Sequence, residues 1–233
     1  MNRPHIICHM GTSIDGKVTG EFLSRPECEK ATEIYYEINR NYKADGFICG
    51  RETMQESFAG KEDAPRYIYK NVEVPSGDFI GDKNAKFFAV SFDRHGHIGW
   101  KSNYIKDEDP GYDNAHIIEV VEGDAVSALS LAYFRDIGIS YIGADTEGEN
   151  IPLALQKLKE NFGFNKLLLE MLDLLEDEMK EKALAKAYVK ILLKLMSEFN
   201  AEASIWLISQ KRKNYYKKYY EICKNAIELK NAK

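Results

Sequence analysis

Two hydrophobic patterns alternate along the first 170 residues. Short apolar runs predict buried strands, whereas apolar positions at three- and four-residue steps predict amphipathic helices. The predicted strands are Pro4–Met10, Gly46–Cys49, Lys86–Phe92, His116–Val121, Tyr141–Gly143 and Lys166–Leu169. The predicted helices are Pro26–Tyr42, Ala125–Ile137 and Ile151–Phe162. This alternation indicates crossover connections, and therefore an α/β fold with a mixed, mostly parallel sheet flanked by helices.

The pattern changes after Glu170. Residues 171–200 contain neither Gly nor Pro, and their apolar positions recur at helical spacing, which predicts a long amphipathic helix. Residues 204–209 (SIWLIS) predict one further strand. Residues 171–233 hold 13 Lys and Arg against 9 Asp and Glu, whereas residues 1–170 hold 19 against 28. We therefore expect a core domain over residues 1–170 and an atypical helical C-terminal segment over residues 171–233.

Composition narrows the class of protein. With 44% hydrophobic and 12% aromatic residues in 233, the chain can bury a sizeable core, which argues against intrinsic disorder. A formal net charge of -5 offers no general cationic surface, so we expect no nucleic-acid partner. No apolar run reaches the roughly 18 residues of a membrane span, and the first residues lack the order of a signal peptide. We expect a cytoplasmic protein with no membrane partner.

Cysteine and histidine spacing argues against a metal site. The four cysteines lie far apart with no CxxC pair, so neither a zinc site nor a disulfide framework is indicated. Cys8 and Cys49 each lie in a short apolar run and are predicted to be buried thiols. His95 and His97 are one glycine apart, but no cluster of Cys or carboxylates nearby completes a ligand set. We expect no metal.

The first candidate for chemistry is the strand exit at residues 8–20 (CHMGTSIDGKVTG). It would place backbone N–H groups, the Ser13 hydroxyl and the Asp15 carboxylate at the carboxyl edge of a sheet, where open α/β folds bind ligands. Asp15-Gly16 also suits a tight turn with no ligand. The residues alone leave both interpretations open.

Two further motifs also follow predicted strands. In GRETM, residues 50–54, Gly50 frees the backbone at the turn, while Arg51 and Thr53 open a helix whose free N–H groups attract anions. Arginine can bind a phosphate through two hydrogen bonds. An ordinary capped helix with a solvated arginine is the alternative. Near the end of the next strand, Ser91 could hydrogen-bond a cofactor.

Taken in order, these motifs resemble a known family. The segments RPHIICHMGTSIDGKVTG, DGFICGRETMQESF, KFFAVSFDRHG and ISYIGADTEGENIPLALQKLKENFGFNKLLLE are similar to the reductase domain of the bacterial bifunctional riboflavin-biosynthesis deaminase-reductase. The resemblance covers about residues 3–170 and implies a dihydrofolate reductase-like fold. No deaminase half is present in this sequence.

The resemblance also implies roles for individual residues. It assigns Gly50, Arg51 and Thr53 to the phosphate side of NADPH, Ser91 to its adenosine half, and Thr12 to cofactor binding as well. The loop that contains Ser13, Asp15 and Gly16 would lie beside the nicotinamide and the substrate, with Asp15 as the catalytic candidate.

The sequence departs from the family after Glu170. There the family has a glycine-rich turn whose backbone lies against the cofactor pyrophosphate, whereas this chain continues with Met171-Leu172-Asp173. Side chains at these positions would prevent the close backbone approach that glycine permits. Cofactor affinity is therefore expected to be weak or absent if no other contact compensates.

Two functions follow. The first is NADPH-dependent reduction of a small heterocyclic or carbonyl substrate, similar to the riboflavin-pathway pyrimidine reductase. The alternative is a catalytically silent relative whose helical C-terminal part serves as an interaction or dimerisation module. A homodimer is compatible with both.

Overall fold

The computed structural model describes residues 2–11, 25–144, 151–170 and 202–203. The chain divides into two compact units. The first comprises Met1–Pro4 and Tyr36–Met171, and the second comprises His5–Tyr35 and Leu172–Lys233. The predicted helix over 171–200 and the strand over 204–209 lie outside the described residues, so the predicted C-terminal segment stays a prediction.

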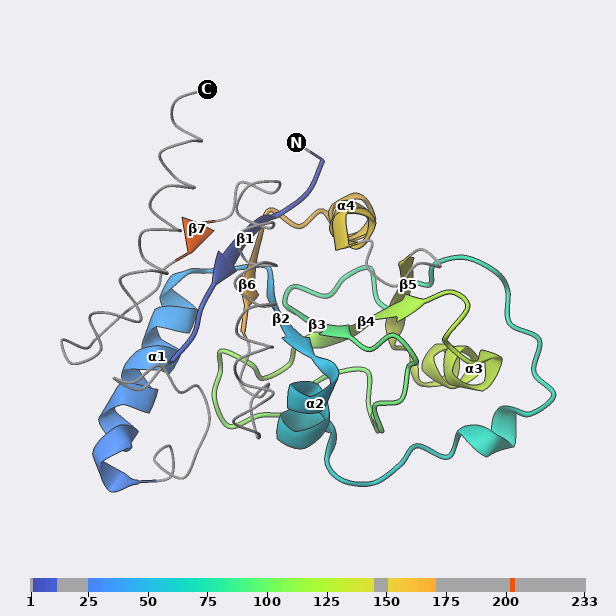
Figure 1. The fold of residues 1–233 in the computed structure, drawn as a ribbon, viewed down its shortest axis with the longest axis horizontal. Helices are drawn as coiled ribbons and strands as arrows, with labels where there is room; N and C mark the ends of the chain where they lie inside the picture. Colours follow the sequence, from blue (N-terminus) through green and yellow to red (C-terminus); the bar gives the residue numbers. More distant parts are fainter. Residues whose placement is uncertain (1, 12–24, 145–150, 171–201, 204–233) are drawn as a thin grey trace, which may run out of the picture. The chain divides into compact units, whose positions relative to one another are not determined.

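A parallel sheet forms the core of the first unit (Figure 1). Its strands, in spatial order, are β5 (Ser140–Ala144), β4 (His116–Glu122), β3 (Phe88–Phe92), β2 (Gly46–Gly50) and β6 (Lys166–Leu169). Every pairing among these five strands is parallel. The predicted α/β class is therefore confirmed, and the carboxyl ends of all five strands meet at one edge.

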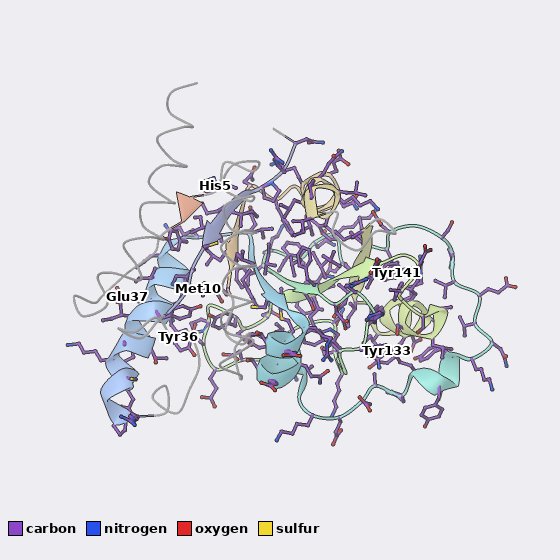
Figure 2. All side chains as sticks on the ribbon, in the orientation of Figure 1. His5, Met10, Tyr36, Glu37, Tyr133 and Tyr141 are labelled. Carbon is purple, nitrogen blue, oxygen red and sulfur yellow. The ribbon has the colours of Figure 1, made fainter. Side chains whose placement is uncertain are left out.

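Helices cover both faces of this sheet. Helix α4 (Ile151–Phe162) lies on one side of the sheet, while α2 (Arg51–Met54) and α3 (Ala128–Ile137) lie on the other (Figure 1). On the α4 side, the ring of Phe88 packs against Phe162 and Phe164, with centroids 5.6 and 4.7 Å apart. On the opposite side, Tyr141 of β5 packs beside α3, where Tyr133 also lies (Figure 2).

Local sequence signals set where the helices begin and end. Helix α4 has the bounds that the hydrophobic pattern predicts. Helix α3 begins at Ala128, not at Ala125, because the hydroxyl of Ser127 accepts a hydrogen bond from the Ser130 amide at 3.1 Å and caps the first turn. It ends at Gly138, whose φ of 79° is a left-handed conformation that favours glycine.

The segment between α2 and β3 is only partly exposed. After Arg51–Met54 the chain continues as a π-helix over Gln55–Ala59 and later forms a 3-10 turn over Arg66–Tyr69. Tyr67 and Ile68 in that turn are exposed. Phe79, in contrast, exchanges two backbone hydrogen bonds of 2.9 Å with Tyr141 at the edge of the sheet. This segment is thus anchored to the sheet near its C-terminal end.

The second unit is described over fewer residues. Strand β1 (His5–Cys8) pairs in parallel with β7 (Glu202–Ala203). A 3-10 turn at Pro26–Cys28 leads into α1 (Glu29–Asn41), which continues into the first unit at Tyr36. Within the second unit, the rings of His9 and Tyr35 stack with centroids 4.0 Å apart.

Cys8 and Cys49 are buried, as the sequence predicts. Cys8 in β1 and Cys49 in β2 are both buried, and both are free thiols, as is the less buried Cys28. Burial raises the pKa of Cys8 to about 11. The pKa of Cys49 is raised well above its usual range, mainly by burial and to a smaller extent by the negative charge of Glu170. Both sulfur atoms therefore remain protonated at neutral pH and pack as small apolar groups.

Candidate functional site

The candidate site lies at the carboxyl edge of the five-stranded sheet, where β2 turns into α2. Gly50 is the last residue of β2 and the N-cap of α2, and it has extended backbone angles of -75° and 167°. Any residue can adopt this conformation, so these backbone angles do not require glycine. A Cβ atom added at Gly50 would meet no atom within 4 Å among the described residues. No described residue therefore occupies the space that a side chain at position 50 would enter.

Arg51 and Thr53 occupy the first turn of this helix and differ in burial. The side chain of Arg51 is 45% exposed, and its guanidinium lies 3.7 Å from the carboxylate of Glu52, a loose and solvated ion pair. Thr53 is buried, so its hydroxyl is not accessible to a ligand at the surface. The turn combines an accessible cation with backbone N–H groups that have no earlier carbonyl partner in the helix, which suits a phosphate.

Ser91 lies in a buried row that crosses the sheet. Its parallel register places Cys49, Ser91, Glu119 and Tyr141 side by side on adjacent strands. Ser91 and Glu119 are both 0% exposed. The Ser91 hydroxyl makes no hydrogen bond within the described part of the chain. A cofactor could reach this hydroxyl only if the covering residues moved, so the assignment of Ser91 to the adenosine half stays a prediction.

A turn stabilised by Asp93 follows β3 at the same edge. One carboxylate oxygen of the buried Asp93 accepts hydrogen bonds from the amides of His97 and Ile98, the latter at 2.8 Å. Arg94, in this turn, forms an ion pair with Glu122 at the end of β4. The turn therefore has a defined shape and joins the ends of β3 and β4.

The two histidines of this turn are exposed and stacked on each other. The rings of His95 and His97 are 5.2 Å apart and inclined by 23°. Nδ1 of His95 lies 3.3 Å from the carbonyl oxygen of Ala125. Among the described residues, no group of three or more His, Cys, Asp or Glu side chains could hold a metal ion.

Glu170 is the buried carboxylate at the end of β6. It accepts hydrogen bonds from Asn39 Nδ2 at 2.6 Å and from the Tyr112 hydroxyl at 2.9 Å. Burial raises the pKa of Tyr36, and the nearby negative charges of Asp107, Asp109 and Glu170 raise it further. Glu170 therefore joins α1 and the loop around Tyr112 to the sheet.

Sequence reasoning assigned no role to Glu119, Asp93 or Asn39. A signal existed for Glu119, because a glutamate interrupts the apolar strand HIIEVV. Asp93 and Asn39 carried no such signal, since both fit solvated positions in a turn and a helix. Thr12, Ser13, Asp15 and Gly16 lie outside the described residues, so their assignment to the nicotinamide and substrate side stays a prediction.

A shallow groove of about 550 Å³ lies elsewhere in the first unit. It runs between residues 72–77 and the segment from Gly123 to Leu131. None of the predicted site residues lines it, and Glu73 is its one charged lining residue. Because no cationic side chain lines this groove, we place the candidate site at the β2–α2 turn.

Comparison with known proteins yields matches among solved structures. No family model matches the chain, and no curated protein sequence does. Among the described residues, no helix is long and apolar enough to cross a membrane. Matching solved structures include a pyrimidine reductase-like protein from Corynebacterium diphtheriae, at 17% identity and a TM-score of 0.44. They also include two forms of RibD from Acinetobacter baumannii, each at 14% identity, with TM-scores of 0.42 and 0.36.

These matches are partial on both sides. They cover 72% of this chain for the Corynebacterium protein and 80% for both forms of RibD. The matched region covers 66% of the Corynebacterium protein, and 44% and 43% of the two RibD chains. The strand order and direction described above show the α/β class by themselves.

Proposed function

We propose that this protein is an NADPH-dependent reductase that acts on a small heterocyclic or carbonyl substrate. The observation that carries the proposal is the β2–α2 turn. There no described residue has an atom within 4 Å of a Cβ placed at Gly50, and the exposed guanidinium of Arg51 lies at the start of a helix. A dinucleotide phosphate needs close backbone approach, N–H donors and a cation, and this turn offers all three.

The roles of the residues follow from their positions. Gly50 would allow the phosphate to approach the backbone, the first amides of α2 would donate to its oxygens, and Arg51 would neutralise it. When bound, NADPH supplies the hydride. The protein's contribution is then to hold the nicotinamide and substrate rings in register and to exclude water. Asp15 is the candidate for contact with the substrate.

The absence of a glycine-rich turn after Glu170 affects the expected affinity for NADPH. The buried carboxylate of Glu170 is committed to Asn39 and Tyr112, and the residues that follow are not glycine. The β2–α2 turn would therefore provide a larger share of the phosphate binding than it does in the family. Substitution of Arg51 is correspondingly informative.

The test is a titration of the full chain with NADPH, followed by fluorescence transfer from tryptophan to the nicotinamide and by thermal shift. Arg51→Ala removes one charge-assisted contact of about 1.5–3 kcal/mol, so binding should weaken about 10- to 100-fold. Arg40→Ala is the matched control, because Arg40 is also an exposed arginine, with a side chain 40% exposed and paired to Asp109. Binding to the Arg40 variant should equal that of the parent protein.

Two outcomes would contradict the proposal. One is the absence of saturable binding at millimolar NADPH, which would favour the catalytically silent alternative. The other is equal weakening by Arg51→Ala and Arg40→Ala, which would indicate a general charge effect. Gly50→Ala adds a second check. The added Cβ meets no atom within 4 Å among the described residues, so the melting temperature should stay unchanged while the methyl group hinders the approach of the phosphate.

A further inference from the structure

Exposed apolar side chains gather in one short segment of the first unit. Among the described residues, the large hydrophobic side chains that are exposed are Tyr67 at 77%, Ile68 at 61%, Val72 at 49% and Ile34 at 47%. Three of these four fall between residues 67 and 72, whereas Ile34 lies on α1. Single apolar residues are ordinary on a protein surface, but a cluster of them indicates a contact surface. The proposed reduction does not use this segment.

The 3-10 turn that begins at Arg66 holds two of these side chains outward. In a 3-10 helix, side chains three residues apart lie on the same face. Arg66 and Tyr69 occupy the inner face, where the guanidinium carbon of the first lies 5.9 Å, and the ring of the second 5.8 Å, from the ring centre of Tyr133 on α3. Tyr67 and Ile68, the two residues between them, therefore form a fixed apolar knob on the outer face.

The groove described above begins a few residues after this knob. Its volume of about 550 Å³ lies within the range of about 300–1,000 Å³ that is typical of binding pockets. One wall, residues 72–77, is tied to α3 because Arg135 donates to the Pro75 carbonyl at 3.2 Å. A Cβ added at Gly77 or Gly123 would meet no atom within 4 Å among the described residues, so the groove is open at both positions. The side chains that line it are mainly apolar, namely Val72, Val74, Pro75, Val126, Ala128 and Leu131.

The knob and the groove carry opposite charges. Lys70, at the end of the 3-10 turn, is exposed, and Glu73 is exposed and is the one charged residue that lines the groove. Neither forms an ion pair with another described residue. An occupant that matches the groove would therefore supply apolar side chains together with a positive charge. The knob with its neighbouring lysine supplies both.

We propose that the knob of one copy of this chain occupies the groove of a second copy, so that the protein forms a homodimer through this face. Because the knob and the groove are adjacent in one segment, a twofold axis between two copies seats both knobs in both grooves at once. Val72, which is exposed and also lines the groove, lies between them in the sequence and would be near the axis. The same axis pairs Lys70 of each copy with Glu73 of the other.

The first measurement is the mass of the full chain in solution. Sedimentation equilibrium and size-exclusion chromatography with light scattering are run from about 1 µM to about 1 mM protein, which covers the dissociation constants of weak and moderate complexes. We expect the mass to rise with concentration from 26.7 kDa towards twice that value. No cofactor is added, so the result can succeed or fail separately from NADPH binding.

Variants of the knob test which surface is buried. Tyr67→Ser and Ile68→Ser should each raise the dimer dissociation constant at least about 30-fold, because central apolar side chains of an interface contribute most to its affinity. Ile34→Ser is the matched control, since Ile34 is the exposed large apolar side chain that lies away from the knob. It should leave the dissociation constant unchanged. Circular dichroism and melting temperature verify that each variant is folded.

Charge reversal tests the twofold arrangement. Lys70→Glu or Glu73→Lys alone breaks both ion pairs of the dimer and should raise the dissociation constant about 2- to 30-fold. The double variant with both reversals restores two opposite-charge pairs across the axis, so its dissociation constant should return to that of the parent protein. Only an interface in which these two residues face each other between copies gives this rescue.

Three results would overturn the proposal. The first is a mass of 26.7 kDa over the whole concentration range, which would leave the groove to a different occupant. The second is a dimer that the knob variants weaken no more than Ile34→Ser does, because the copies would then pair through another surface. The third is the absence of a charge effect or of its rescue, which would exclude the twofold seating of the knob in the groove.

Discussion

Replacing Asn39 with alanine tests how strongly the buried carboxylate of Glu170 joins helix α1 to the sheet. The Asn39 amide donates to Glu170 Oε1 over 2.6 Å, and both side chains are at least 96% buried. A hydrogen bond to a charged group contributes about 1.5–3 kcal/mol to stability, and its loss leaves the carboxylate poorly solvated. We expect Asn39→Ala to lower the free energy of unfolding by about 2–3 kcal/mol.

That loss translates into a measurable change in melting temperature. For a chain of this size, about 1 kcal/mol corresponds to about 2–4 °C, so the transition should move down by about 4–12 °C. Differential scanning calorimetry and urea denaturation both measure this change. Asn41→Ala is the matched control, because Asn41 lies on the same helix and is exposed. It should stay within about 0.5 kcal/mol of the parent protein.

Tyr112→Phe separates the two donors to Glu170. The Tyr112 hydroxyl donates to Oε2 over 2.9 Å, so its removal should cost about 1.5 kcal/mol. The substitution also removes the weaker 3.4 Å hydrogen bond from Asn39 to this hydroxyl, and it leaves the bond from Asn39 to Glu170 in place. Because both donors act on one carboxylate, the double variant should deviate from additivity by at least about 0.5 kcal/mol. A cost for Asn39→Ala no greater than that of Asn41→Ala would refute the argument, since Glu170 would then need no donor from α1.

The remaining predictions concern Glu119 and Gly81. Because folding raises the pKa of Glu119 above its unfolded value, its contribution is most favourable below the unfolded pKa and declines as pH rises toward the folded pKa. Glu119→Gln should therefore become more stable relative to the parent protein as pH rises, which urea denaturation at several pH values measures; a pH-independent difference would contradict this. Gly81→Ala would place a Cβ 2.0 Å from the Gly138 carbonyl oxygen and should cost at least about 1–3 kcal/mol by thermal denaturation. The Cβ of the control Gly123→Ala meets no atom within 4 Å in the part of the chain that the structure describes, so this variant should change stability by less than about 0.5 kcal/mol; equal costs would refute the packing argument.

The hydrophobic pattern was sufficient to locate the main strands and helices of residues 1–170. Apolar periodicity located each described strand and the three helices, and it gave α4 its observed bounds. Alternation of strands and helices was sufficient for the parallel sheet, because parallel neighbours need a crossover between them. Helix capping was less visible, and Ser127 displaced the start of α3 by three residues.

The candidate site was only partly visible in the sequence. The GRETM motif located the β2–α2 turn, because a glycine followed by an arginine at a helix start has a local meaning. The reason for Gly50 was not visible, since open space at its Cβ depends on which atoms from distant segments come near. The burial of Ser91 was likewise hidden, because its neighbours on β2 and β4 come from other parts of the chain.

The sequence by itself determined the order, type and approximate bounds of strands β1 to β6 and of helices α1, α3 and α4, since these depend on periodicity and on neighbours a few residues away. The tertiary structure decided which polar groups meet. Register places Glu119 beside Ser91, and packing brings Asn39 to Glu170, 131 residues further along the chain. Which polar groups meet depends on the order and register of neighbouring strands, and on the need of each buried polar group for a partner. Neither of these can be read from a local sequence pattern.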